Sequence, residues 1–338
     1  MRTLEELENR LSAPSERLVE DVKNIKGDIL ILGVGGKMGP SLARLARRAL
    51  DEAGSGQRVI GVSRFSQGSL QEELEIVGVE TIAADLTDEA ELRQLPAAEN
   101  VIYMVGKKFG TSGQEHMTWA MNSYLPGRVA EKFKKSRIVV FSSGNIYPYV
   151  PVFSGGATED TLPGPLGEYA QSCLGRERIF EHFSRKYEIP MLIYRLNYAV
   201  EMRYGNLLEI ARSVYQKKTI DLKMGHMNVI WQGDANEIAL RSLLHCSTPP
   251  KLLNVTGPET ISIRWAAEEF GKIFGIKPLF ENEEEPTALL NNASHSHQLF
   301  GYPSVSLTQV MEWTAEWVQL DGATLDKPTH FQVRSGNF

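Results

Sequence analysis

The sequence contains few cysteines, no long apolar run and no excess of basic residues. Its two cysteines, Cys173 and Cys246, have neither metal-binding nor redox spacing, so we expect two free thiols. No stretch approaches the roughly 18 uninterrupted apolar residues that a membrane span needs. The first residues mix acidic and basic side chains and lack the apolar core of a secretion signal. We therefore expect a cytoplasmic protein with no membrane partner.

The charge balance argues against nucleic acid as the main partner. The 338 residues include 36 Lys and Arg and 42 Asp and Glu, and this net charge of -6 provides no general attraction to phosphate backbones. Two histidines, His295 and His297, lack the neighbouring ligands that a metal ion requires, and we predict no metal site. The composition is that of an ordinary globular protein, whose partner we expect to be a small molecule.

Alternating apolar runs and helical patterns predict most of the first half of the chain. Residues 3–23 have a roughly helical apolar spacing that Pro14 interrupts, which indicates a helical arm. From Asp28 the chain reads DILILGVGG, a nearly all-apolar run that is typical of a buried parallel strand. Four further strands are predicted, at 58–63, 80–85, 100–106 and 136–143. Helical segments separate most of them, and the one at 117–135 contains Pro126, where we expect a kink.

Strands that alternate with helices predict an α/β fold. We expect a Rossmann-type doubly wound parallel sheet with helices on both faces and ligands beyond the carboxyl ends of its strands. After about residue 198 the pattern is less regular and indicates a smaller, interleaved C-terminal substrate lobe. The predicted boundaries are an arm at 1–26, a nucleotide-binding domain at 27–197 to which 229–255 return, the lobe at 198–228 and 256–320, and a tail at 321–338.

A glycine-rich turn follows the first predicted strand. The segment GVGGKMG places Gly33, Gly36 and Gly39 between that strand and a helix. Glycine permits a tight turn, lets a pyrophosphate approach bare backbone, and allows the helix to pack closely on the strand. The N-terminus of the helix then offers free N–H donors to the phosphates. The turn therefore predicts a dinucleotide site.

Residues after the second predicted strand indicate which dinucleotide binds. An acidic side chain there holds the free ribose hydroxyl of NAD, but this chain has Ser63 and Arg64. A hydroxyl and a guanidinium suit the 2′-phosphate of NADP, with Lys37 or Arg58 as further sources of charge. We therefore prefer NADP over NAD. Asp85, which ends the third predicted strand, either meets the adenine edge or caps the next helix.

Together these features resemble the extended short-chain dehydrogenase/reductase family, in its NAD-dependent epimerase/dehydratase branch. The resemblance covers roughly residues 28–320. It rests on GVGGKMG and AADLTD together with VVFSSGNIYP, ATEDTLPGPLGEYAQS, NVTGPETISIRWAAEEFGKIFG and HQLFGYPSV, which follow one another in the family's order.

The resemblance implies a hydride-transfer enzyme, which in this family is often a homodimer. A tyrosine phenol, which maps onto Tyr169, would exchange a proton with a substrate hydroxyl, and Ser143 would orient that substrate. The cofactor residues that the resemblance implies are Gly33, Gly36, Lys37, Met38, Gly39, Ser63, Arg64, Asp85, Leu86, Val105, Gly106, Asn122, Tyr169 and Cys173. The implied substrate residues are Ser143, Asn145, Asn197, Tyr198, Trp231 and Gln232.

The chain departs from the family at the lysine that follows the tyrosine by four residues, where it has Cys173. A positive charge about 5 Å from the phenolate is worth roughly 3 kcal/mol at an effective dielectric near 20. That energy corresponds to on the order of two pKa units, and a thiol does not supply it. Arg176 and Arg178 follow on the same helix, and we expect both to lie too far from the phenol.

Three explanations of Cys173 stay open. Lys107 or Lys108, after the fourth predicted strand, supplies the missing cation. Alternatively, Tyr169 acts as a neutral acid in carbonyl reduction, or another group transfers the proton. In the third explanation the fold binds a cofactor without catalysis. We expect Cys173 itself to be an inert, buried side chain.

The substrate lobe lacks the arginines with which nucleotide-sugar enzymes of this family hold a pyrophosphate. Met227 and Trp231 take the places of the family's arginine and histidine in MNVIWQGD, and FENEEEPTALL contains no arginine. We therefore expect an NAD(P)-dependent oxidoreductase that acts on a hydroxyl or carbonyl of a small sugar, polyol or hydroxy acid. The alternatives are a sugar or nucleotide-sugar epimerase or dehydratase, and a cofactor-binding sensor or scaffold that catalyses nothing.

Overall fold

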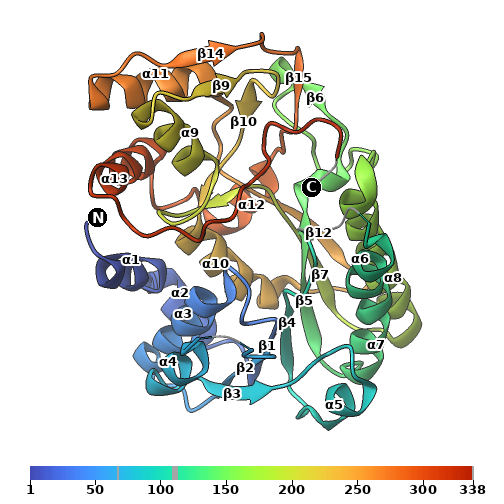
Figure 1. Ribbon diagram of the computed structural model, residues 1–338. Coiled ribbons are helices and arrows are strands. Elements are labelled where there is room, and N and C mark those ends of the chain that lie inside the picture. The colour runs from blue at the N-terminus through green and yellow to red at the C-terminus, as the bar shows by residue number, and fades with distance from the viewer. Residues whose placement is uncertain (67, 109–112, 337–338) are drawn as a thin grey trace.

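A seven-stranded parallel sheet forms the centre of the molecule in the computed structural model, which describes residues 1–66, 68–108 and 113–336 (Figure 1). Its strand order is β12-β7-β5-β4-β1-β2-β3. The strands are β1 (Ile29–Leu32), β2 (Val59–Ser63), β3 (Glu80–Ala83), β4 (Asn100–Tyr103), β5 (Arg137–Ser143), β7 (Met191–Leu196) and β12 (Lys251–Val255). The order reverses between β1 and β4, where a doubly wound sheet opens its ligand crevice. The predicted Rossmann-type fold class is confirmed.

Helices cover both faces of this sheet. One face carries α2 (Glu16–Val22), α3 (Gly39–Glu52) and α10 (Gln232–Arg241), and the other carries α5 (Glu89–Gln94), α7 (Leu125–Lys132) and α8 (Gly167–Tyr187). Successive side chains of β1 alternate between the two apolar cores, with Ile29 and Ile31 in one and Leu30 and Leu32 in the other. Both faces are buried, which explains why β1 is entirely apolar.

The second half of the chain builds a smaller lobe around a core of its own. That core is formed largely by α9 (Asn206–Tyr215), α11 (Ile263–Phe274) and α13 (Leu307–Gln319). The remaining helices are α4 (Leu70–Ile76), α12 (Ser294–Phe300) and the short turns η2 (Gly144–Ile146), η3 (Val152–Ser154) and η4 (Ser242–His245). The short strands are β6 (Val150–Pro151), β8 (Ala199–Val200), β9 (Thr219–Asp221), β10 (His226–Met227), β11 (Ile230–Trp231), β13 (Ile261–Ser262), β14 (Leu279–Glu281) and β15 (Thr287–Ala288).

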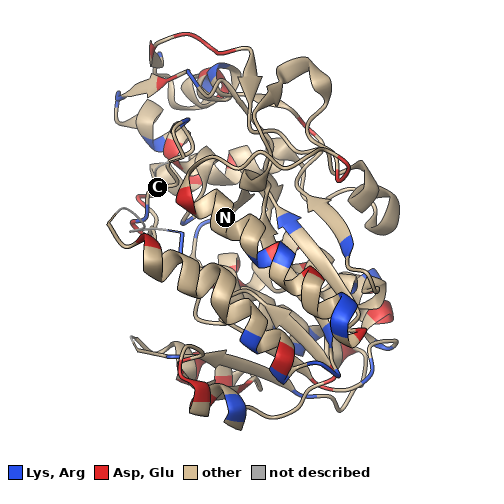
Figure 2. Cartoon of the chain, turned by 90° about the vertical axis from the view of Figure 1, so that its right-hand side faces the viewer, with Lys and Arg blue, Asp and Glu red and all other residues tan. Residues whose placement is uncertain are grey.

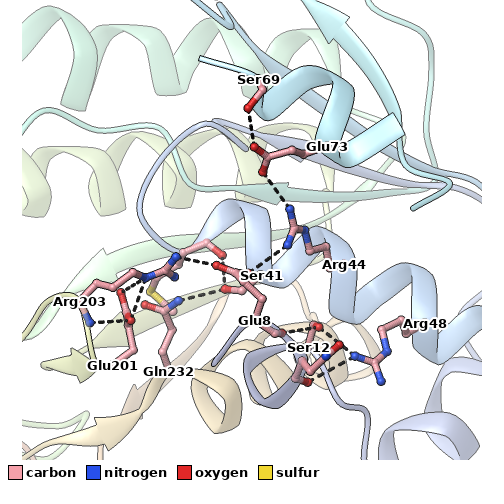
Figure 3. Close-up of polar contacts among 12 residues, drawn as sticks. Glu8, Ser12, Ser41, Arg44, Arg48, Ser69, Glu73, Glu201, Arg203 and Gln232 are labelled. Carbon is pink, nitrogen blue, oxygen red and sulfur yellow. Dashed lines mark hydrogen bonds and ion pairs between the residues drawn. The ribbon is translucent and has the colours of Figure 1, made fainter. Parts of the chain in front are cut away.

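The N-terminal arm consists of two helices, α1 (Leu4–Leu11) and α2, on either side of Pro14. The hydroxyls of Thr3 and Ser15 cap their first turns, as the N-cap preference of Thr and Ser predicts. Figure 3 shows how α1 is held: Glu8 forms ion pairs with Arg44 of α3 at 3.2 Å and with Arg203 of the smaller lobe at 2.6 Å. The arm therefore joins the two lobes.

The helical segment around Pro126 is interrupted rather than simply kinked. It is divided into α6 (Glu115–Trp119), a π-helical turn η1 (Ala120–Tyr124) and α7. Pro126 lies in the first turn of α7 and has no N–H to donate to the preceding π turn. The π turn places Asn122 in the interior, fully buried beside α8. Such turns are frequent at functional sites.

The C-terminal tail crosses from one lobe to the other. In Figure 1 it runs in dark red from α13 towards β6 and the start of α8. Thr329 donates from its backbone and hydroxyl to Glu209, and Phe331 is buried in the core of the smaller lobe. Further along, the Arg334 guanidinium donates to the backbone and hydroxyl of Thr287. The tail is thus fixed to the smaller lobe at Thr329, Phe331 and Arg334, and Gly336 then contacts Gly167 at the start of α8.

Charges of both signs are interspersed on the face that Figure 2 presents. Within the part of the chain that the structure describes, no helix is long and apolar enough to cross a membrane. Cys173 and Cys246 form no disulfide bond, as predicted.

Burial of the arm makes a testable contribution to stability. Leu18 of α2 is fully buried in the core beside α3, whereas Leu4 of α1 is exposed. Leu18→Ala should lower the free energy of unfolding by about 2–5 kcal/mol, because it removes buried methyl groups and leaves a cavity. The matched control Leu4→Ala should change it by less than about 0.5 kcal/mol. Urea denaturation followed by circular dichroism measures both; equal effects would contradict this packing of the arm.

Candidate active site

The predicted site residues lie at the carboxyl edge of the sheet, where the loops after β1, β4, β5 and β7 meet. A cleft of about 170 Å³ there is lined by residues that include Tyr169, Ser143, Lys37, Lys108 and Asn145. A larger hollow of about 330 Å³ lies around Arg212 on the smaller lobe and does not include Tyr169. We place the candidate site by its chemistry, in the smaller cleft.

The glycine-rich turn has the geometry that a dinucleotide requires. Gly33 adopts a positive φ of 89°, which favours glycine, and its N–H donates to Val62. A Cβ on Gly39 would overlap the carbonyl of Val34, and one on Gly35 would overlap the hydroxyl of Ser63. Helix α3 begins at Gly39 and directs its first N–H groups towards the turn. The residues present therefore fit a bound dinucleotide.

The predicted ribose corner lies beyond the end of β2. Ser63 packs against Gly35, and Arg64 is exposed and close enough for its charge to help lower the pKa of Asp85. The largest cause of that lowered pKa is a hydrogen bond from Thr87, because the Asp85 carboxylate accepts from the Thr87 hydroxyl at 2.7 Å. Asp85 therefore shapes a turn, and the cap of α5 is Asp88.

Two proposed sources of charge for a 2′-phosphate do not reach this corner. Arg58 precedes β2 at the opposite end of the sheet, where it pairs with Asp28 at 2.6 Å. The ammonium of Lys37 points across the cleft and donates to the carbonyl of Ala199 at 2.7 Å. Of the predicted charges, only Arg64 remains at the ribose corner. Met38 and Leu86 are buried, with their side chains in the apolar cores.

The loop after β4 is held by the buried side chain of Asn122. Its carbonyl accepts from the Lys107 N–H at 2.8 Å, and its amide donates to the Lys107 carbonyl at 3.0 Å. Gly106 has no room for a side chain, because a Cβ would overlap the guanidinium of Arg176. Val105 packs against Gly33. The loop therefore lies directly against the glycine-rich turn, as a nicotinamide site requires.

Only one of the two lysines in this loop faces Tyr169. The Lys107 ammonium donates to Gln114 at 2.9 Å, away from the cleft. Lys108 lines the cleft, and its ammonium approaches the carbonyl of Thr329 at 3.5 Å. Burial lowers the pKa of Lys108 to about 8, with the Cys173 thiol among the groups that favour its charged form.

Tyr169 lies between Ser143 and Cys173. The phenol of Tyr169 is hydrogen-bonded to the hydroxyl of Ser143 and to the thiol of Cys173. Burial is the largest cause that raises the pKa of Tyr169, and the neighbouring thiol raises it further. Burial also raises the pKa of Cys173. Both groups are therefore neutral at pH 7, and the side chains of Tyr169 and Ser143 lie together in the cleft.

The expectation that Arg176 lies too far from the phenol is wrong. Its guanidinium is the largest cause that lowers the pKa of Tyr169, and its side chain is only 5% exposed. It donates to the carbonyl of Phe141 at 2.8 Å and to Asn122 at 2.9 Å. The expectation considered only the rise along α8. Helical side chains point back towards the N-terminus and arginine is long, so the guanidinium reaches closer to the phenol than that rise implies.

The predicted substrate residues fall into two groups. Asn145, Asn197 and Tyr198 line the cleft with Tyr169, and Tyr198 has a positive φ of 48°, an uncommon conformation for a non-glycine residue. Trp231 and Gln232 do not line it. Trp231 packs edge-on against Trp313 with ring centroids 5.4 Å apart, and Gln232 donates to Ser41 of α3 at 3.0 Å.

Seven cleft residues were not predicted: Ser142, Leu196, Ala199, Tyr204, Gly205, Asn206 and Thr329. Thr329 of the tail lines the cleft opposite Ser143, although nothing in its neighbourhood has a recognisable motif or periodicity. The ring of His297 donates to the Thr256 carbonyl at 3.2 Å, and His295 lies beside Glu159. Among residues 1–66, 68–108 and 113–336, no group of three His, Cys, Asp or Glu side chains is placed to hold a metal.

Three solved structures with similar folds are distant from this chain in sequence. UDP-glucuronic acid 4-epimerase from Bacillus cereus, solved with UDP-glucuronic acid and NAD, is 19% identical, with a TM-score of 0.70 over 86% of this chain and 99% of that chain. UDP-glucose 4-epimerase from Thermotoga maritima, solved with UDP-glucose, is 16% identical, with a TM-score of 0.70 over 86% and 98%. UDP-glucose 4-epimerase from Thermus thermophilus, solved with NAD, is 17% identical, with a TM-score of 0.71 over 88% and 100%.

No curated protein sequence matches the chain significantly. The model of the NAD dependent epimerase/dehydratase family, however, matches residues 29–237, which is more than half of the chain and includes both the glycine-rich turn and Tyr169. The chain therefore belongs to the NAD-dependent epimerase/dehydratase family.

Proposed function

We propose that this protein moves a hydride between a nicotinamide dinucleotide and a hydroxyl-bearing carbon of a small sugar derivative. The observation that carries the proposal is the hydrogen-bonded pair of Tyr169 and Ser143, which shares one cleft with the turn before α3. A phenol and a hydroxyl directed at the same space are suited to hold a substrate oxygen and to move its proton. The bound nicotinamide would supply or accept the hydride at the adjoining carbon.

Tyr169 would exchange the proton at the substrate oxygen, and Ser143 would fix the position of that oxygen. Arg176 supports this step without touching the substrate. Its charge offsets part of the increase that burial causes in the pKa of Tyr169, and its hydrogen bonds to Phe141 and Asn122 fix its position. We therefore assign to Arg176, as a positioning residue, the electrostatic part of the family lysine's role.

An epimerase is the first candidate, because the chain belongs to the epimerase/dehydratase family. An epimerase oxidises and then reduces one carbon, and no cofactor is consumed overall. A net reductase is the second candidate. Burial and Cys173 keep the phenol of Tyr169 protonated, and a protonated phenol suits donation to a carbonyl. A change in NADH or NADPH absorbance during turnover distinguishes the reductase from the epimerase.

We propose a substrate without a nucleotide. Met227, at the place of the family's arginine, is buried in the core of the smaller lobe, where it has no charge to offer a pyrophosphate. The cleft of about 170 Å³ is also smaller than the roughly 300–1,000 Å³ typical of sites for larger ligands. A sugar, polyol or hydroxy acid fits these limits.

Two substitutions test the role assigned to Tyr169. Tyr169→Phe should reduce turnover by about 100-fold or more, because it removes the proton that the substrate oxygen exchanges. Cys173→Ala should preserve turnover, because the thiol is buried and neutral. Steady-state rates measured with a panel of sugars and dinucleotides check both. Unchanged turnover in the Tyr169→Phe protein would refute the assignment, and dinucleotide binding without any turnover in the unsubstituted protein would favour a sensor or scaffold.

The pH profile tests Arg176. Removing its charge raises the pKa of Tyr169 further, because a cation favours the phenolate. If the enzyme reduces a carbonyl, its activity falls as the pH rises through the pKa of Tyr169. Arg176→Met should therefore move this limb of the profile, the decrease in activity at high pH, to higher pH. Arg176→Lys retains the charge and should leave the limb near its original position. A limb that does not move in a folded Arg176→Met protein would contradict the electrostatic role.

Preference for NADP rests on Arg64. Arg64→Ala should reduce the ratio of NADPH affinity to NADH affinity by about tenfold, because a charge-assisted hydrogen bond to the 2′-phosphate is lost. The matched control is Arg178→Ala, which removes an exposed arginine from α8, and it should leave the ratio unchanged. Fluorescence titration measures both ratios. If Arg64→Ala leaves the ratio unchanged, the preference has no support.

A further inference from the structure

Lys37 belongs to the glycine-rich turn, but its side chain is directed at the substrate lobe. Its ammonium donates to the carbonyl of Ala199 at 2.7 Å and lies 4.2 Å from the centre of the Tyr204 ring. Both partners lie between β7 and α9, on the far side of the cleft from the turn. A lysine ammonium has three donors, and the carbonyl uses one of them. The other N–H donors of the ammonium therefore remain for a ligand in the cleft that Lys37 lines.

The charge of Lys37 has no carboxylate partner within the described part of the chain. The nearest acidic group that favours its charged form is Glu201. That carboxylate is committed elsewhere, because it pairs with Arg203 at 3.2 Å and also accepts the Arg203 N–H at 2.9 Å. Figure 3 shows Glu201 directed at Arg203, which in turn reaches Glu8. Removing a cation even partly from water without an anionic partner is costly, so this arrangement favours a ligand that brings the anion.

A second cation faces the same space. Lys108 lines the cleft from the loop after β4, and its charge disfavours the charged form of Lys37. The pKa of Lys37 is lowered to about 7, mainly by burial, and the charges of Lys108 and Arg203 contribute to this decrease. An anion held between the two ammoniums would relieve their repulsion and restore their charges.

The rest of the described lining carries no charged side chain and includes several polar ones. Ser143 and Asn145 approach from the end of β5 and Asn197 from the end of β7. The side-chain nitrogen of Asn197 is buried and has no hydrogen-bond partner. Buried donors without a partner are uncommon and indicate a group still to be bound. Hydroxyl or carbonyl oxygens of a ligand would satisfy it.

We propose that the substrate carries a carboxylate that Lys37 binds, with Lys108 facing it, so that the substrate is a sugar acid or a related hydroxy acid. The inference rests on the proposed function and assigns its substrate class. It also reassigns Lys37 from the dinucleotide to the substrate.

The proposal predicts a distinctive pH dependence. Lys37 is charged below its lowered pKa and neutral above it, so affinity for a carboxylate should weaken as pH rises from 6 to 9. The groups that bear on this titration are Glu201, Lys108 and Arg203, with the Tyr204 ring in contact and the phenol of Tyr169 across the cleft. The pKa of Tyr169 is raised, so the phenol stays neutral over this range.

Calorimetric titration of the full chain, saturated with its dinucleotide, tests the proposal. The probes are glucuronate and gluconate, with glucose and glucitol as uncharged counterparts of the same size. The unsubstituted protein should bind at least one acid, and its uncharged counterpart at least tenfold more weakly. Lys37→Met should lose this preference, whereas Lys37→Arg, charged at every pH used, should keep acid binding and show a smaller decline with pH, which comes from Lys108. Lys135→Met, at an exposed lysine, is the control.

Each outcome separates this inference from the proposed function. A preference for acids that Lys37→Met abolishes, with dinucleotide affinity within about threefold of the original, supports the proposal. Equal binding of acids and neutral sugars, or no binding of any acid by a dinucleotide-saturated protein, overturns it while the proposed function stands. A large loss of dinucleotide affinity in Lys37→Met also overturns it, because Lys37 would then serve the pyrophosphate. If the unsubstituted protein binds no dinucleotide, the proposed function itself fails, and this inference fails with it.

Discussion

The buried guanidinium of Arg176 holds together the half of the cleft that contains Tyr169. It donates to the end of β5 through Phe141 and to the π turn through Asn122. Asn122 in turn holds the backbone of the loop after β4 and donates to Ser172 of α8 at 2.9 Å. Four separate segments therefore depend on one buried cation, and its charge acts on the phenol that we assign to catalysis.

This arrangement offers a physical account of a missing lysine. A lysine four residues after Tyr169 would place its charge at the cleft surface, within reach of a cofactor. Arg176, three residues further along α8, instead places its charge in the interior near the phenol. The Phe141 carbonyl and the Asn122 side chain hold the guanidinium there, and it is buried away from solvent. The phenol then remains neutral at rest, because burial and Cys173 outweigh the guanidinium. Such a site is better suited to donating a proton than to removing one, unless a bound cation or substrate lowers the pKa of the phenol.

Sequence patterns sufficed where a few neighbouring residues determine the structure. The apolar run of β1, the glycines that follow it and the alternation of apolar runs with helical patterns are local features, and the predicted fold class followed from them. Strand β7 was not identified, although MLIYRL is largely apolar, because it follows Pro190 directly and the pattern beyond it is irregular. Only pairing with β5 and β12 identifies it as a strand of the sheet.

The parts of the site that were missed depend on contacts between distant residues. Thr329 reaches the cleft because Glu209 and the buried Phe331 fix the tail, and no local pattern reports such contacts. The direction of the Lys37 side chain depends on Ala199 and Tyr204, which come from the other lobe. Trp231 and Gln232 were expected in the cleft from motif position alone, and the packing between α10, α3 and α13 places them elsewhere.

The central claim is that this cleft binds a nicotinamide dinucleotide and uses it. The most direct measurement is a fluorescence titration of the purified protein with NADH and NADPH, after an absorbance spectrum has shown whether a dinucleotide was retained through purification. The account predicts binding of at least one of them with micromolar or tighter affinity, or a dinucleotide already bound. If neither binds and none was retained, the account is contradicted, and the cradle formed by Gly33, Gly35 and Gly39 serves another purpose.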